Sequence, residues 1–426
     1  MPYVLEKLNS HTQTLTVIVL LSAFTLLLTV RGWANICFTF LVLIAIAYLT
    51  LTKKTGAVKS IKSQWLIAFL CLPVITLLLT QTIRHDFILR SYDAPIRLLL
   101  AAPLVYFFSS KKINIVNILG FSIPLCLVLT ALAIYIHPEY IAQWSGRYAT
   151  RFVDPNSFGN FSVILTGFCL FNLNNPLKVN KSWSIYQLIG LVTGVGLILG
   201  SGTRGSWLAI PLIITFWLVT NSQYMSWKQS CIGFAILAIM AVMAYTTFPS
   251  VSVRFLSIFN EIQGWLNRSV VDSSAGIRLT MWKMSWALFQ HNPLLGYGDI
   301  GVRSFLNEPW LTIVSTDVAK QTIFCCGPHN EFLANLLRSG ILGGLSVLGL
   351  LGYPIYFFAT YLKSSNTQIA LAAQIGISYL IVMCVCSMSM EVFNLKYDCS
   401  FYALVISGLV SQILYFTHHD AQTCQT

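Results

Sequence analysis

Twelve long, apolar stretches that are nearly free of charge dominate this chain of 426 residues. A helix needs about 20 mainly apolar residues to cross the hydrocarbon core of a bilayer. Hydrophobic residues make up 56% of the sequence and charged residues only 9%, which excludes an ordinary soluble domain. We therefore expect an all-α polytopic membrane protein with about 12 transmembrane helices. The predicted spans cover residues 14–30, 33–52, 64–83, 94–110, 113–136, 158–177, 184–200, 205–224, 229–248, 340–362, 368–390 and 399–417.

Lysine and arginine lie at opposite ends of the predicted spans. Eleven of the fourteen lysines share the side of the two termini, whereas all twelve arginines lie on the other side. Twelve of the fourteen acidic residues also lie on the arginine side, so few negative charges offset the lysines in their loops. Such loops are typical of the cytoplasm, although Lys and Arg counted together give eleven inside against fifteen outside. Because the arginine fork suits bidentate contact with phosphate, we expect the outer face to hold phosphate.

Four polar segments lie on the arginine side, and the predicted spans are nearly free of charge. The segments are 84–97, 137–157, 201–204 and 249–330. A transporter places ionisable groups or broken helices near the middle of the membrane, so the clean spans favour chemistry at the outer boundary. We expect transmembrane helices 1–9 in residues 1–248, an outer helical subdomain in 249–330, and transmembrane helices 10–12 with a cytoplasmic tail in 331–426.

Charge and motifs also exclude several classes of partner. The net charge of +12 does not indicate nucleic-acid binding, because the basic residues are spread along short loops, where membrane lipids explain them better. The sequence has no Walker motif, dinucleotide fingerprint or Asp-x-Asp pair, so we expect no soluble nucleotide donor. A lipid-linked donor, which carries its own phosphates, is the natural substitute. Cys325 and Cys326 could pair with each other or with Cys399, and the pattern decides neither.

Three motifs resemble, in order and context, those of the O-antigen ligase and polymerase superfamily. They are GSGTRGSWLAI around Arg204, AGIRLTMWKMSWALFQHNPLLGYG around Arg278 and GPHNEFLANLLRSGILG around His329. In the last motif, nine residues separate His329 and Asn330 from Gly340, and Gly343 follows. This spacing is similar to the His-[Asn/Ser/Gln]-x9-Gly-x-x-[Gly/Thr/Tyr] signature of O-antigen ligases. The resemblance covers roughly residues 60–415.

The resemblance implies the fold and chemistry of a C-type membrane glycosyltransferase. Members of the family transfer a glycan from undecaprenyl pyrophosphate to a sugar hydroxyl of the lipid A core, with inversion and without a metal or other cofactor. The resemblance also implies a multi-pass protein of the bacterial inner membrane with its active site on the periplasmic side. The nearest alternatives are an O-antigen polymerase and a protein O-oligosaccharyltransferase, and a lipid-linked sugar flippase is more remote.

The matched motifs assign roles to three residues, and each has a structural alternative. Arg204 and Arg278 are expected to neutralise the charge that develops on the pyrophosphate leaving group. His329 is expected to accept the proton of the attacking hydroxyl, because histidine has a suitable pKa range. In the alternative interpretation, Arg204 snorkels at the membrane boundary, Arg278 is a solvated surface charge, and His329 caps the following helix.

Four other residues are candidates for secondary substrate contacts. They are Arg84, Arg90, Arg97 and Asn156. The three arginines alternate with aspartates, so they form either an ion-paired loop or a second phosphate subsite. Asn156 follows Asp154 and Pro155, a pattern typical of a helix N-cap with proline at the first position, and Asn156 could also touch the donor.

Overall fold

The computed structural model describes residues 2–52, 58, 60–173, 175, 178, 180–221, 235, 242–243, 245–247 and 249–423. All regular secondary structure in these residues is helical, which confirms the all-α class. Seven of the described helices are long and apolar enough to cross a membrane. They are α2 (Trp33–Thr52), α3 (Ile61–Arg84), α6 (Ile115–Ile136), α9 (Lys181–Ser201), α18 (Glu331–Ala359), α19 (Thr367–Ser387) and α20 (Lys396–Thr423).

Four more of the predicted spans hold helices that are not among these seven. Two of these spans hold single helices, α1 (Pro2–Thr25) and α8 (Pro155–Leu173). The other two are broken, one into α4 (Ile96–Leu99) and α5 (Ala101–Ser109) and one into α10 (Arg204–Trp207) and α11 (Ala209–Asn221). The predicted span 229–248 falls largely outside the described residues. The protein is therefore a polytopic helical membrane protein, and the number of twelve spans stays a prediction.

The bundle is built around α19 and α20. In the most apolar stretch of α19, 72% of the residues are buried, and in that of α20, 89% are buried. The corresponding value is 33% in both α3 and α9, so these two helices lie at the periphery. Aromatic rings join the central helices: Tyr379 of α19 meets Phe401 of α20 edge to face, with ring centroids 5.8 Å apart. Phe161 of α8 packs on the same Phe401 ring at 5.3 Å. These contacts tie the helix that carries Asn156 to the centre of the bundle.

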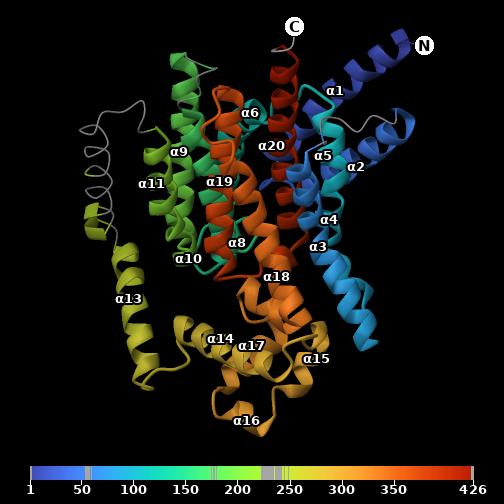
Figure 1. Ribbon diagram of the computed structural model, residues 1–426. Helices are drawn as coiled ribbons and strands as arrows, with labels where there is room; N and C mark the ends of the chain where they lie inside the picture. Colours follow the sequence, from blue (N-terminus) through green and yellow to red (C-terminus); the bar gives the residue numbers. More distant parts are fainter. Residues whose placement is uncertain are drawn as a thin grey trace.

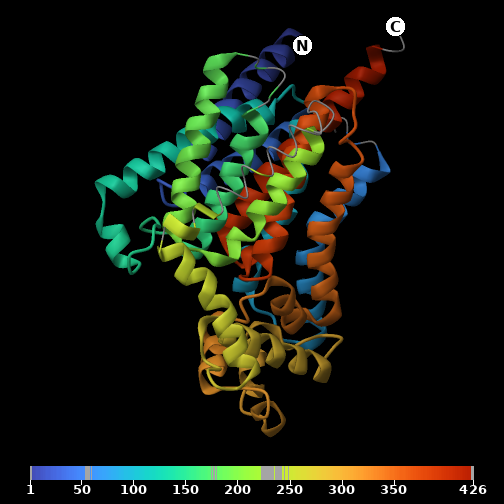
Figure 2. The same ribbon diagram turned by 90° about the vertical axis from the view of Figure 1, so that its left-hand side faces the viewer.

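A smaller group of helices lies at the end of the bundle opposite the two termini (Figures 1 and 2). It consists of α14 (Ser274–His291), α15 (Gly298–Phe305), α16 (Pro309–Thr312) and α17 (Asp317–Cys326), and α13 (Pro249–Leu266) leads into it at the edge of the molecule. The group has its own apolar core, which includes Met284, Leu288, Leu311 and Ile323. At the end of α17, Cys325 and Cys326 form a disulfide, whereas Cys399 is buried and free.

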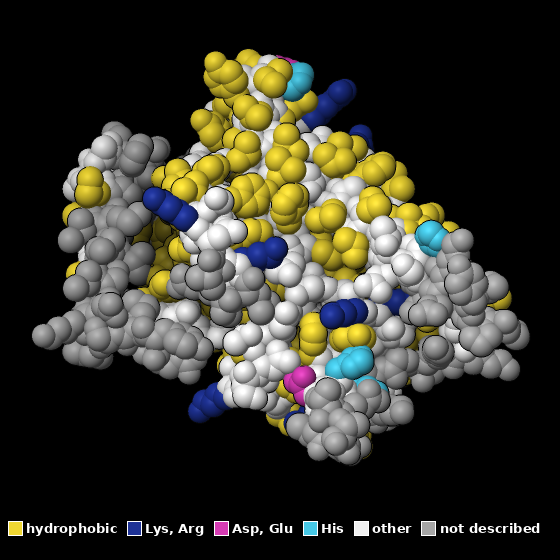
Figure 3. Space-filling model, turned by 90° about the horizontal axis from the view of Figure 1, so that it is seen from above, with side chains coloured by type: hydrophobic (Ala, Val, Ile, Leu, Met, Phe, Trp, Pro, Cys, Tyr) yellow, Lys and Arg dark blue, Asp and Glu magenta, His cyan; other side chains and the backbone are white. Residues whose placement is uncertain are grey.

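The end that bears the termini differs in charge from this helical group. Seen from above, it displays Lys and Arg side chains spread among apolar ones, with few acidic side chains among the described residues (Figure 3). This distribution agrees with the lysine-rich loops expected at that end.

Helix α18 bends at the boundary between its outer part and its membrane part. Gly340 has φ +60° and ψ −151°, which only glycine adopts readily. A Cβ atom on Gly340 would lie 2.3 Å from the carbonyl oxygen of Leu294, so this position has no room for a side chain. The bend coincides with the predicted start of the span at residue 340.

The bend docks the outer helical group onto the bundle. At the bend, the Ile341 N–H donates to the Pro293 carbonyl at 2.8 Å, and the Tyr297 N–H donates to the Leu337 carbonyl at 2.6 Å. Both bonds join α18 to the turn after α14. Since α14 carries Arg278, the bend in α18 fixes where this arginine lies relative to the bundle.

Candidate active site

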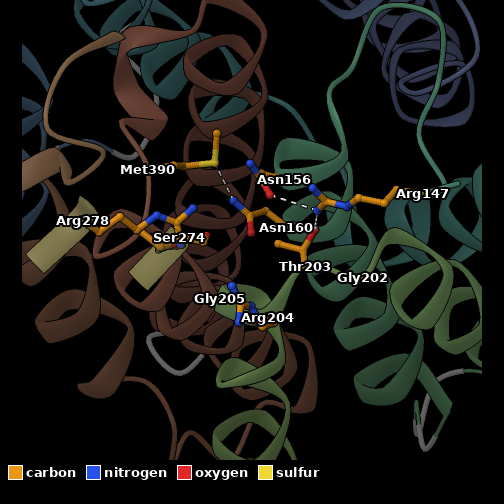
Figure 4. Close-up of a pocket in the computed structure, with 11 residues that line it drawn as sticks. Arg147, Asn156, Asn160, Gly202, Thr203, Arg204, Gly205, Ser274, Arg278 and Met390 are labelled. Atoms are coloured by element: carbon orange, nitrogen blue, oxygen red, sulfur yellow. Dashed lines mark hydrogen bonds between the residues drawn. The ribbon is translucent and has the colours of Figure 1, made fainter. Parts of the chain in front are cut away.

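A polar pocket of about 140 Å³ lies between α8, α10, α14 and the segment that follows α19 (Figure 4). Three arginines line it, Arg147, Arg204 and Arg278. None of the lining residues that the structure describes is acidic. The other polar side chains of the wall are those of Asn156, Asn160, Thr203, Ser274 and Ser389. Three positive charges in one small cavity favour an anionic ligand with more than one charge.

Arg204 begins α10 directly after the turn that ends α9. Gly202 closes α9 with φ +60°, and Thr203 then extends the chain toward the pocket. Arg204 Nη1 donates to Glu261 Oε1 at 2.9 Å and to Ser257 Oγ at 2.6 Å, both on α13. The Arg204 side chain is 20% exposed. These contacts hold the guanidinium inside the protein, which does not agree with a snorkelling side chain at the lipid boundary.

Arg278 lies one turn inside α14. The helix is positioned by Ser273, whose hydroxyl oxygen caps it by accepting the Gly276 N–H at 3.2 Å. Burial and the neighbouring Arg204 lower the pKa of Arg278, and Glu261 partly opposes them. Within the described part of the chain, the Arg278 guanidinium has no hydrogen-bond or ion-pair partner. A partly buried guanidinium without a partner is poised to bind an anion, because its charge is poorly solvated.

Arg147 is the third arginine of the pocket, and no sequence motif singled it out. It comes from the polar segment 137–157, which was recognised only as an outer loop. Its Nε donates to the Ser201 carbonyl at 2.7 Å, and its Nη2 donates to Asn156 Oδ1 and Thr203 Oγ1 at 3.0 Å each (Figure 4). These bonds fix the guanidinium at the wall. The only signal in the sequence was the concentration of arginine on this side.

Asn156 follows the capping residue of α8 and lines the pocket, and its contact with the donor stays a prediction. Asp154 Oδ1 accepts the N–H groups of Asn156 at 2.9 Å and Ser157 at 3.2 Å, so the predicted N-cap of α8 is confirmed. Helix α8 begins at Pro155, as the cap pattern predicts. The Asn156 side chain lines the pocket beside Arg147. The cap therefore orients the first turn of α8 toward the arginines.

His329 lies beside the pocket rather than in its wall. Its backbone is left-handed, with φ 49°, a conformation that His, Asn and Asp adopt more often than other side chains. Burial and the neighbouring Arg278 lower the pKa of His329, and Asp154 acts in the opposite direction. The imidazole is therefore within electrostatic reach of both Arg278 and the cap of α8. A lowered pKa keeps it neutral at neutral pH, the form that accepts a proton.

The capping alternative for His329 is wrong. The N-cap of α18 is Asn330, whose side-chain oxygen accepts the Leu333 N–H at 3.0 Å. The backbone N–H of His329 points instead at the carboxylate of Glu391, which lies after α19. Gly327 has φ 75°, a backbone conformation that favours glycine, and the Glu391 carboxyl packs against this turn. Burial raises the pKa of Glu391 to about 7, although Arg338 opposes the rise.

The same stretch of chain matches a known protein family. Residues 189–348 match the family model described as O-antigen ligase, and this segment contains Arg204, Arg278 and His329. This part of the chain is therefore similar to the O-antigen ligase family. The resemblance inferred from the three motifs is thereby confirmed.

Two related proteins extend the comparison. An O-antigen ligase of Salmonella typhimurium is 30% identical over 156 residues, which is 36% of this chain and 35% of that protein. An uncharacterized protein of Haemophilus influenzae is 24% identical over 373 residues, which is 87% of this chain and 91% of that protein. The similarity to a named O-antigen ligase is therefore local, whereas the similarity to the uncharacterized protein extends over most of both chains.

The two glycines of the ligase-like signature have structural roles. Gly340 forms the bend in α18, and a Cβ atom on Gly343 would lie 2.0 Å from the Asn335 carbonyl oxygen. The signature thus combines a residue beside the pocket, His329, with the cap and bend of the helix that follows it.

The arginines of segment 84–97 do not line the pocket. Arg84 Nε donates to Asp86 at 2.9 Å, and its Nη1 donates to the Leu295 carbonyl at 2.5 Å. Arg90 is exposed and Arg97 half-buried, and neither lines the pocket. Arg84 therefore fits the ion-paired interpretation and helps to join α3 to the outer helical group. A second phosphate subsite in this segment stays a prediction.

Proposed function

We propose that this protein is an O-antigen ligase, which transfers a glycan from undecaprenyl pyrophosphate to a sugar hydroxyl of the lipid A core. The pocket carries the proposal, because it brings Arg204 and Arg278, from separate motifs, into one cavity with a third arginine. The family match supports the class of reaction. The donor has an anionic pyrophosphate in its lipid anchor, which is the chemistry that such a cavity recognises.

In the proposed reaction, the acceptor hydroxyl attacks the anomeric carbon of the glycan from the face opposite the pyrophosphate. The new carbon–oxygen bond forms as the bond from the anomeric carbon to the pyrophosphate oxygen breaks, which inverts the configuration. The electron pair of the broken bond stays on that oxygen, where Arg204, Arg278 and Arg147 stabilise the developing charge. The hydroxyl proton goes to the neutral imidazole of His329.

We place the active site on the periplasmic side of the bacterial inner membrane. Both termini lie at the end of the bundle opposite the outer helical group (Figure 1), and the sequence predicts the lysine-rich loops on the same side, which supports a cytoplasmic location for the termini. Each charged group of the reaction then comes from the outer boundary of the membrane. The donor can reach this boundary by lateral diffusion in the bilayer.

Transfer with purified full-length protein tests the proposal. Undecaprenyl pyrophosphate-linked glycan is incubated with lipid A-core, with a second copy of the lipid-linked glycan, or with a protein that offers serine hydroxyls. A ligase modifies only the lipid A-core. Chain extension of the lipid-linked glycan would instead indicate an O-antigen polymerase, and modified protein would indicate a protein O-oligosaccharyltransferase.

A further inference from the structure

The guanidinium proposed to hold pyrophosphate is already bound to an anion of the protein itself. Arg204 Nη1 donates to Glu261 Oε1 at 2.9 Å, and Arg204 Nη2 donates to Glu261 Oε2 at 3.5 Å. Glu261 Oε2 also accepts the N–H of Ala275 at 2.7 Å, in the first turn of α14. An arginine fork together with a helix N-terminal amide is a set of donors that also suits a phosphate oxygen.

Glu261 is ionised at neutral pH. Burial raises its pKa, but hydrogen bonds from Arg204 and from the Ala275 N–H more than reverse this effect, and the net pKa lies below the usual value for glutamate. The Glu261 side chain is 17% exposed, so water screens its charge only partly. A lipid pyrophosphate that approaches Arg204 therefore meets a negative charge that is already in place.

The position of Glu261 allows its charge to separate from Arg204 without disturbing the bundle. Helix α13 lies at the edge of the molecule (Figure 1). Phe255, Phe259 and Ile262 recur on one face of α13 and are exposed, whereas Ser257 and Glu261 occupy the opposite face, toward Arg204. A small shift of α13 or a rotamer change of Glu261 would release the guanidinium to the pocket.

The charge of Glu261 affects how tightly the pocket binds the donor and the product. The three arginines of the pocket carry three positive charges, and Glu261 offsets one of them. The diester pyrophosphate of the donor carries two negative charges. The undecaprenyl pyrophosphate that remains after transfer is a monoester with one more ionisable oxygen. Without an opposing carboxylate, three arginines would hold this product more tightly than the donor.

We propose that Glu261 competes with lipid pyrophosphate for Arg204: it pairs with the guanidinium in the free protein, gives way when the donor binds, and pairs again as undecaprenyl pyrophosphate leaves. The inference rests on the proposed function, because it assigns the anion that the pocket binds. Glu261 is then a positioning residue that acts through Arg204 and assists product release.

Binding of undecaprenyl pyrophosphate to the full-length protein in lipid nanodiscs tests this role. Glu261→Gln removes the charge but keeps an oxygen that accepts hydrogen bonds from Arg204 and Ala275. We expect Glu261→Gln to bind undecaprenyl pyrophosphate on the order of tenfold more tightly than the wild type, because one adjacent like charge is gone. Glu308→Gln, which removes a carboxylate of the outer helical group that does not line the pocket, should bind as the wild type does.

Kinetics provide a second test, because a purely structural role of Glu261 would not change product release. Glu261→Gln should retain the single-turnover rate but slow in steady state, with inhibition by undecaprenyl pyrophosphate at lower concentration. Glu261→Ala, with its thermal melting temperature measured to check folding, should also bind the product more tightly. Unchanged or weaker binding by both variants would overturn the inference and leave Glu261 as an anchor for Arg204. A wild-type protein that binds no undecaprenyl pyrophosphate would overturn the proposed function itself.

Discussion

The side-chain oxygen of Asn330 accepts the N–H of Leu333 at 3.0 Å and so caps α18. The imidazole of the preceding residue, His329, has no part in this cap, and its ring lies within electrostatic reach of Arg278. Two adjacent residues of the ligase signature thus have separate tasks. Asn330 begins the helix, and His329 is available for chemistry beside the pocket.

We expect His329→Ala to lower the rate of glycan transfer on the order of a hundredfold or more, because the acceptor hydroxyl loses its proton acceptor. His329→Asn and His329→Ser should be equally impaired, since the cap of α18 is already supplied by Asn330. Asn also tolerates the left-handed backbone at this position. All three variants should still bind the lipid-linked donor, whose phosphates are held by the arginines. Substantial transfer by the Asn or Ser variant would show that His329 is not the proton acceptor.

Replacing an arginine of the pocket by lysine preserves the charge but removes the bidentate fork. We expect Arg204→Lys and Arg278→Lys each to lower transfer on the order of a hundredfold, and Arg147→Lys on the order of tenfold. The rate is measured at saturating acceptor with protein levels matched. Arg268→Lys is the control, because Arg268 is exposed and lies outside the pocket. Near-normal transfer by all three pocket variants would show that these arginines act only through their charge and make no essential bidentate contact.

The transfer rate should depend on pH through His329. Its folded pKa is below 6.5, the ordinary histidine value, so the neutral, proton-accepting form persists at neutral pH and is lost only as the pH falls below 6.5. We expect a single-turnover rate that is constant near pH 7 and decreases at lower pH.

Glu391 is the competing explanation for such an acid limb, because its pKa is about 7. Glu391→Gln cannot ionise but can still accept the N–H of His329. If His329 is the titrating base, the acid limb of Glu391→Gln should match that of the wild type. Disappearance of the limb in this variant would assign it to Glu391.

Gly340→Ala should destabilise the protein by about 1–3 kcal/mol, because the new methyl group collides with the Leu294 carbonyl and the backbone has a positive φ. Thermal melting in detergent measures the change. Gly196→Ala in α9 is the matched control, since a Cβ atom there meets nothing within 4 Å. A melting temperature of Gly340→Ala equal to that of the control would contradict the proposed docking role of the bend.

The proposed orientation predicts where a reporter enzyme is active. Alkaline phosphatase fused after Ser273, at the start of α14, should be active in cells because it would lie in the periplasm. A fusion after Lys112, between α5 and α6, should be inactive. The reverse pattern would invert the topology and move the pocket to the cytoplasmic side.

The all-α membrane class and the residues of the recognisable motifs could be predicted from the sequence. Uncharged apolar stretches form helices in a membrane because every backbone group must be bonded within its own segment, and this requirement is local. The cap of α8 at Asp154 was equally predictable, because a cap depends on residues within one turn. The family motifs identified Arg204, Arg278 and His329, and two of these three line the pocket.

The pairing of charges could be seen only in the folded protein. Arg147 joins the pocket through hydrogen bonds to Ser201 and Thr203, more than fifty residues away in the chain. Glu261 pairs with Arg204 across a similar separation, and neither contact has a local pattern. The hydropathy pattern likewise did not predict the helix breaks within spans, such as the break between α10 and α11. Hydropathy and capping depend on neighbours in the chain, whereas ion pairs and pocket walls depend on how distant segments pack.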